Sequence, residues 1–145
     1  MIKDCFKPAP LSTKASTGLL ILRLVAGLAF MLHGWGKIQH PFSWMGPDSG
    51  TPAIFQGLAA LSEFGGGLAW ILGLLTPLAS LGVACTMAMA VRLHMLVMGD
   101  PFVASKQGQG SYELAALYLV IAVLLILTGP GRWSADRFVF GQKEH

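Results

Sequence analysis

Long apolar stretches constrain this chain more than any other feature of its sequence. They cover about residues 17–36, 54–75, 77–98 and 112–128. A helix needs roughly 20 apolar residues to cross the hydrocarbon core of a bilayer. Inside lipid, only helices and closed barrels satisfy every backbone hydrogen-bonding group. The pattern therefore predicts an all-α membrane protein, built as a bundle of four transmembrane helices.

Composition agrees with this prediction. The chain has 145 residues, a length that suits one domain, and only 12% of them are charged, against roughly 25% in an average soluble domain. The net charge of +3 is modest, so we expect an anionic lipid surface as the partner and no nucleic acid. No apolar core precedes residue 18, so we expect no removable targeting peptide. Residues 1–16 and 136–145 are predicted to be tails that flank a membrane domain at 17–135.

The distribution of lysine and arginine predicts the orientation of the bundle. An even number of spans places both termini on one side of the membrane. The tail-side cations are Lys3, Lys7 and Lys14 before the first span, and Arg132, Arg137 and Lys143 after the last. The loops on the other side carry little more than Lys37 and Lys106. The positive-inside rule then places both termini in the cytoplasm.

Each predicted span carries ionisable residues. They are Arg23, His33 and Lys37 on the first span, Glu63 on the second, Arg92 and His94 on the third, and Glu113 at the start of the fourth. A charge at the bilayer centre costs about 2.5–3.5 kcal/mol on insertion scales. We therefore expect these side chains to face one another or water.

Helical spacing places several of these charges on helix faces rich in small residues. The stripe on the first span is Arg23, Gly27, Phe30, Gly34 and Lys37, and the stripe on the second is Ala59, Glu63, Gly66, Gly67 and Trp70. Small residues let helices approach closely, so the glycines of the segment HGWGK are expected to make room where helices meet.

The predicted ligand-binding residues form a polar cluster that opens to the outer side. They are His33, Lys37, Glu63, Arg92, His94 and Glu113, with Arg23 as a deeper buried charge. Two glutamates can balance two of the three cations, and Arg92 or Arg23 is the expected partner of Glu63. Purely structural alternatives remain open: Lys37 snorkels to headgroups, His33 is an interfacial histidine, and Glu63 with Arg92 is a structural ion pair.

Other residues invite metal or redox interpretations that the spacing does not favour. Met87, His94 and Met98 fit soft ligands for Cu(I), but methionine at helical spacing usually packs in a core, so no metal site is predicted. Cys5 and Cys85 form no CxxC pair, and Cys85 is expected to be a small buried residue. The tryptophans Trp35, Trp44 and Trp133 fit interfacial belts.

Several segments, taken in order, resemble the DoxX family of small four-span bacterial membrane proteins. They are LLILRLVAGLAF, LHGWGK, SEFGGGLAWILGLLTPLA, the pair Arg92 and His94, SYELAALYL and GPGRWSAD. The resemblance implies a four-helix membrane bundle and a link to respiratory and redox chemistry, because relatives include subunits of a thiosulfate:quinone oxidoreductase. The dithiol of some distant redox relatives is absent here, and the resemblance assigns no catalytic residue.

The leading hypothesis is an integral membrane subunit of a quinone-linked oxidoreductase in the bacterial inner membrane. His33, His94 and Glu63 suit proton exchange, while Arg92 and Lys37 suit a reduced, anionic oxygen. The sequence carries no haem, flavin or iron–sulfur motif, so electrons are expected from a soluble or membrane redox partner. Two alternatives use the same residues: a small-solute transporter, and a scaffold that anchors a soluble redox enzyme. Assembly as a homo-oligomer is compatible with each.

Overall fold

The computed structural model describes residues 11–140, and this part of the chain is helical with no strand. The elements are α1 (Thr13–Gln39), α2 (Ala53–Leu72), α3 (Thr76–Arg92), the π-helix η2 (Leu93–Met98), α4 (Glu113–Thr128) and the short α5 (Ala135–Phe140). The four substantial helices follow the four apolar stretches, so the all-α prediction is confirmed. Cys5 and the outer parts of both predicted tails lie outside the described residues.

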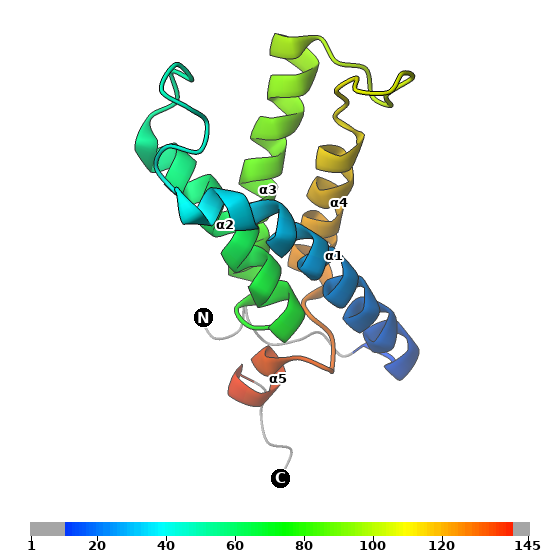
Figure 1. The fold of residues 1–145 in the computed structure, drawn as a ribbon. Coiled ribbons are helices and arrows are strands. Elements are labelled where there is room, and N and C mark those ends of the chain that lie inside the picture. The colour runs from blue at the N-terminus through cyan, green and yellow to red at the C-terminus, as the bar shows by residue number, and fades with distance from the viewer. Residues whose placement is uncertain (1–10, 141–145) are drawn as a thin grey trace.

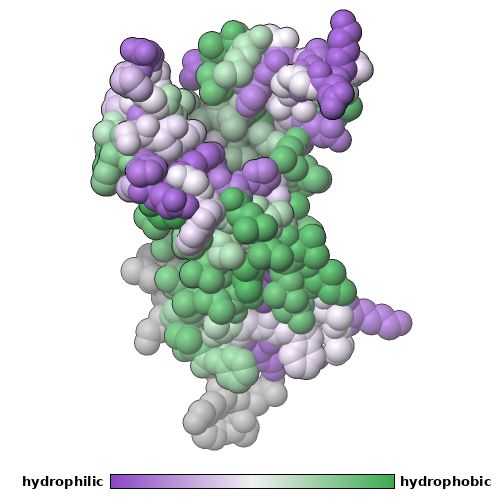
Figure 2. Space-filling view, in the orientation of Figure 1, coloured by the Kyte–Doolittle hydropathy of each residue, from purple (hydrophilic) through white to green (hydrophobic). Residues whose placement is uncertain are grey.

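Two of the helices are long and apolar enough to cross a membrane: α1, and α3 with η2 as one continuous segment. Helix α4 is apolar but shorter. Figure 2 shows hydrophobic residues covering the middle of the molecule, with hydrophilic residues gathered at the end that carries loops 40–52 and 99–112. Large hydrophobic side chains such as Val25, Leu81 and Leu127 are more than half exposed, as expected of a surface that faces lipid. Cys85 also lies on the exposed surface, so its predicted burial was wrong.

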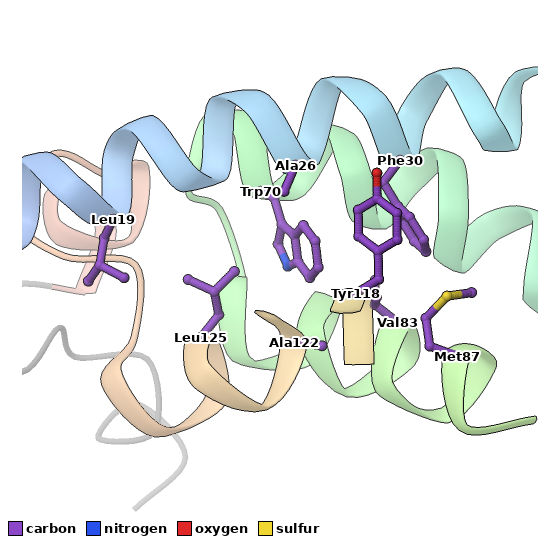
Figure 3. Packing of buried hydrophobic residues seen from close by; sticks show 9 residues of the cluster. All are labelled: Leu19, Ala26, Phe30, Trp70, Val83, Met87, Tyr118, Ala122 and Leu125. Carbon is purple, nitrogen blue, oxygen red and sulfur yellow. The ribbon is translucent and has the colours of Figure 1, made fainter. Parts of the chain in front are cut away.

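The helices pack as two pairs, α1 with α2 and α3 with α4, joined through contact between α2 and α3 (Figure 1). An aromatic cluster fills the space where the pairs meet (Figure 3). The ring of Phe30 lies 5.8 Å from that of Trp70 and 4.8 Å from that of Tyr118, measured between centroids. The Trp70 indole N–H donates to the Ser80 hydroxyl at 2.9 Å, which satisfies the one polar group of that buried ring.

Helices α1 and α2 touch through their backbones at three glycines. A Cβ added to Gly34 would lie 2.4 Å from the Phe64 nitrogen. A Cβ on Gly27 would lie 2.7 Å from the Gly67 oxygen, and one on Gly67 would lie 2.6 Å from the Gly27 oxygen. No side chain fits at these positions without moving backbone. The predicted close approach is therefore present, and Gly34 is the glycine of HGWGK that makes it.

Arg23 lies in the N-terminal half of α1, about four turns before Lys37, with only 1% of its surface exposed. Its guanidinium donates to three backbone carbonyls: Trp70 at 2.9 Å, Trp133 at 2.9 Å, and Pro130. These bonds tie α1 to the end of α2 and to the segment that follows α4. Arg23 is thus a buried charge, as predicted, but Glu63 is not its partner.

Asp136 fastens the same end of the molecule. Its carboxylate accepts from the backbone nitrogens of Leu75 at 2.6 Å and Thr76 at 2.9 Å, the free donors at the start of α3. A threonine before a proline, as at Thr76 and Pro77, is typical of an N-cap followed by the first helical residue, but Leu75 holds the N-cap position with φ 48°. A carboxylate from a distant segment therefore replaces the expected local cap. Asp136, the first residue of the predicted C-terminal tail, is fully buried and belongs to α5.

The glycine contacts yield a matched pair of variants. Gly34→Ala should destabilise the fold by about 3 kcal/mol, because the new methyl group overlaps rigid backbone. Gly36→Ala is the control: nothing lies within 4 Å of its Cβ, and alanine exceeds glycine in helix propensity. Thermal unfolding in detergent measures both. Equal melting temperatures for the two variants would contradict the close contact of α1 with α2.

Candidate functional site

An ion pair between Lys37 of α1 and Glu63 of α2 forms the centre of the candidate site. The distance from Lys37 Nζ to Glu63 Oε1 is 2.5 Å. The Glu63 side chain is 5% exposed and the Lys37 side chain is 27% exposed, so the lysine lies toward the surface. The helix contact explains the pairing: a Cβ on Gly34 would lie 2.9 Å from the Glu63 carbonyl carbon, and Lys37 follows Gly34 by about one turn.

This pairing corrects the sequence-based expectation that Arg92 or Arg23 is the partner of Glu63. Arg23 is bonded to backbone carbonyls of Trp70 in α2 and Trp133 after α4. The Arg92 side chain is exposed on α3 and, within residues 11–140, forms no ion pair or hydrogen bond. The error has a physical reason. Spacing along each helix gave the correct inward faces, but the relative shift of α1 against α2 decides which charge lies opposite Glu63.

The second carboxylate oxygen of Glu63 has no hydrogen-bond partner among residues 11–140. Oε2 is buried and accepts no hydrogen bond from the described part of the chain. A buried acceptor left unsatisfied costs about 1–3 kcal/mol, and more when the group is charged. A buried polar atom without a hydrogen bond needs an explanation in a native structure, and a bound ligand that donates to it is one such explanation. Glu63 can therefore accept a hydrogen bond from a ligand while Lys37 neutralises its charge.

Loop 40–52 lies against the ion pair through Trp44. Lys37 Nζ is 4.4 Å from the centre of the Trp44 ring, within the range of a cation–π interaction. The indole N–H donates to the Gln56 carbonyl at 3.0 Å. The Gln56 side chain accepts from the Met45 nitrogen at 3.1 Å and donates to the Thr51 oxygen at 2.9 Å. Gln56 thus bonds to the loop at two points, Met45 and Thr51, and attaches it to α2.

Sequence reasoning missed the roles of Gln56 and Trp44. Gln56 is 4% exposed, and its position near the start of an otherwise apolar stretch was the available signal. Trp44 was expected only as part of an interfacial belt. Beside them lies a cavity of about 340 Å³. It is lined by Phe42, Ser43, Gly46, Pro47, Ser49, Gly50, Thr51, Ala53 and Gln56.

A second polar pair lies on the third span. His94 Nδ1 is 2.7 Å from Asp100 Oδ2, and the Asp100 backbone nitrogen donates to the His94 carbonyl at 2.9 Å. The pair stands where η2 gives way to loop 99–112, so His94 holds that loop to its helix. The two methionines that were considered with His94 as soft ligands differ in environment: Met87 packs in the core, whereas Met98 is exposed. Among the described residues, no three potential His, Cys, Asp or Glu ligands come together.

The remaining predicted site residues are at the surface. His33 is exposed, and its ring is nearly perpendicular to that of Tyr118, with the centroids 6.3 Å apart. Glu113 is exposed at the first turn of α4 and, within residues 11–140, takes part in no ion pair. Of the six residues predicted to bind a ligand, only Lys37 and Glu63 touch each other. Binding by any of the six stays a prediction.

The fold and the buried charges define a small helical membrane protein. Residues 18–98 match the DoxX family, more than half of the chain, and the chain belongs to that family. It is 33% identical over 132 residues to inner membrane protein YqjF of Escherichia coli, covering 84% of this chain and 92% of that protein. It is 30% identical over 141 residues to membrane protein Rv3486 of Mycobacterium tuberculosis, covering 90% and 86%.

A third relative carries a functional name. "Putative oxidoreductase CatD" of Bacillus subtilis is 30% identical over 131 residues, which cover 88% of this chain and 91% of that protein. No solved structure matches the chain significantly.

The ion pair can be tested by removing each partner in turn. Lys37→Met should destabilise the protein by about 3 kcal/mol or more, because it leaves the buried Glu63 carboxylate without its cation. Adding Glu63→Gln should recover part of that loss, since the double variant leaves no buried charge at this site. Thermal unfolding in detergent gives both values, with the exposed Lys106→Met as the control for loss of a lysine. A loss of stability in Lys37→Met that Glu63→Gln fails to reduce would contradict the pairing.

Proposed function

We propose that this protein is an integral subunit of a quinone-linked oxidoreductase system in the bacterial inner membrane. Family membership and the membrane-protein names of two relatives support the location. The name of the Bacillus relative supports an oxidoreductase role. The proposal adds a quinone as ligand, a soluble or membrane redox partner as source of electrons, and an orientation with both termini in the cytoplasm.

The unpaired Oε2 of Glu63 is the observation that carries the proposal. A quinol has a hydroxyl that can donate a hydrogen bond to this oxygen, and a quinone carbonyl can accept one from Lys37 Nζ. The pair therefore offers one acceptor and one donor within a single contact of 2.5 Å. A carboxylate beside an ammonium group is also suited to exchange a proton with the ligand.

The location of the pair fits a ligand that partitions into lipid. Lys37 lies in the last turn of α1, and that end of the helix leads into loop 40–52, which lies at the hydrophilic end of the molecule (Figures 1 and 2). Apolar surfaces of the helices extend from there toward the opposite end. An amphipathic molecule with a polar head and an apolar tail can place its head at the pair and leave its tail in the bilayer.

Quinone binding is tested on the purified protein. Mass spectrometry of the lipid extract should find quinone, and a short-chain ubiquinone should raise the melting temperature. Glu63→Gln should weaken the affinity about tenfold, equivalent to about 1.4 kcal/mol, because an amide accepts a hydrogen bond more weakly than a carboxylate and exchanges no proton. Glu113→Gln is the matched control, since Glu113 is exposed on α4. No quinone and no thermal shift in the wild type would overturn the proposal and favour a transporter or a scaffold.

The orientation is tested separately with reporter fusions. A reporter that is active only in the periplasm should be silent after His145 and active when inserted near Gly50, because the lysines and arginines gather toward the two termini. The opposite pattern would overturn the cytoplasmic placement of both termini. It would leave the quinone proposal to be judged by its own experiment.

A further inference from the structure

The Glu63 carboxylate is nearly closed off from its surroundings, although its partner Lys37 is partly exposed. Its unpaired oxygen is buried, whereas 27% of the Lys37 side chain is exposed. Lys37 therefore lies on the outward side of Glu63. Because Lys37 is the more exposed partner, its movement away from Glu63 would open the carboxylate to a ligand.

Trp44 packs against the ammonium group of Lys37. The lysine side chain is long and flexible, and a lysine near the end of a membrane helix tends to extend toward the headgroups. Here its ammonium group instead lies 2.5 Å from the Glu63 carboxylate and 4.4 Å from the centre of the Trp44 ring. The ring opposes the outward movement through a cation–π interaction.

The position of Trp44 depends in turn on Gln56. Two backbone groups of the loop, at Met45 and Thr51, bond to the Gln56 side chain, and the Trp44 indole bonds to the Gln56 carbonyl. Elsewhere loop 40–52 is turn and bend, with Gly46 and Gly50 at positive φ. Gln56 therefore supplies the side-chain hydrogen bonds that hold this loop to α2, while the Phe42 ring packs on Gly57 of the same helix. Loss of the Gln56 bonds would loosen the segment that carries Trp44.

We propose that loop 40–52 is a gate over the Lys37–Glu63 pair and that Trp44 is the positioning residue that closes it. The gate regulates the site assigned above, so its biological meaning rests on the proposed function. When Trp44 leaves Lys37, the lysine turns outward and the Glu63 carboxyl becomes accessible. When Trp44 returns, Lys37 again neutralises the carboxylate and closes the route to it.

Access to Glu63 can be measured without quinone, through its reaction with a hydrophobic carbodiimide. This reagent adds to carboxyl groups, and mass spectrometry of peptides gives the rate at each position. In the whole protein in detergent, Glu113 is exposed and provides the internal reference. Trp44→Leu should raise the labelling of Glu63 relative to Glu113 about tenfold, and Trp44→Phe, which keeps an aromatic face, should raise it less. Gln56→Leu should raise it as well, by freeing the loop.

Trp35→Leu is the matched control. Trp35 lies on the same end of α1, but it is 56% exposed and its ring packs on Phe64 instead of on the ion pair. An unchanged Glu63 to Glu113 ratio in Trp44→Leu would overturn the gate, and so would an equal increase in Trp35→Leu. Melting temperatures of the four variants show whether a rise reflects unfolding, which would increase labelling in proportion to lost stability. Increased labelling without quinone binding would support the gate and remove the proposed function, whereas quinone binding with unchanged labelling would do the reverse.

Discussion

The direct backbone contact between α1 and α2 is the constraint on which the rest of the structure depends. Gly27, Gly34 and Gly67 each lie so close to the opposite helix that a methyl group would overlap its backbone. In a bilayer, helices gain little from burying apolar surface against each other, so close van der Waals packing has to supply much of the attraction. The same contact fixes the shift of α1 along α2. That shift places the Lys37 ammonium group beside the Glu63 carboxylate.

The buried charges at the two ends of the bundle have different kinds of hydrogen-bond partner. At one end, Arg23 donates to three backbone carbonyls, and Asp136 accepts two backbone N–H groups at the start of α3. These charges are bonded to main-chain groups that cannot move far, so they stabilise one arrangement of α1, α2 and α3. At the other end, Glu63 is bonded through one oxygen to a flexible lysine. Charges bonded to main-chain groups are typical of a structural role. The Glu63 arrangement leaves one carboxylate oxygen available to a ligand.

Much of the fold was predictable from sequence, because its main signals are local. Apolar length gave the four helices, GPG marked the end of α4, which stops at Thr128, and small residues marked the inward faces. What failed depends on distant segments. The partner of Glu63 required the shift between helices, and the cap of α3 comes from Asp136, sixty residues further along the chain. Trp44 and Gln56 meet only because loop 40–52 folds back on α2. Periodicity in the sequence does not predict such a contact between a loop and a helix.

The Lys37–Glu63 site differs from the Arg23 site in one respect: Glu63 Oε2 accepts no hydrogen bond from the described residues. Helix packing brings Lys37 and Glu63 together, but it supplies no N–H for Glu63 Oε2, since the neighbouring α1 backbone is helical and its own N–H groups are already bonded. A side-chain donor within hydrogen-bonding distance of Oε2 would have satisfied this oxygen and given the ion pair a structural role. The glycine at position 34 offers no such donor, because the close contact of the helices excludes any side chain there. The packing that creates the ion pair therefore also leaves its carboxylate half satisfied, and a donor from outside the chain is what the remaining oxygen can accept.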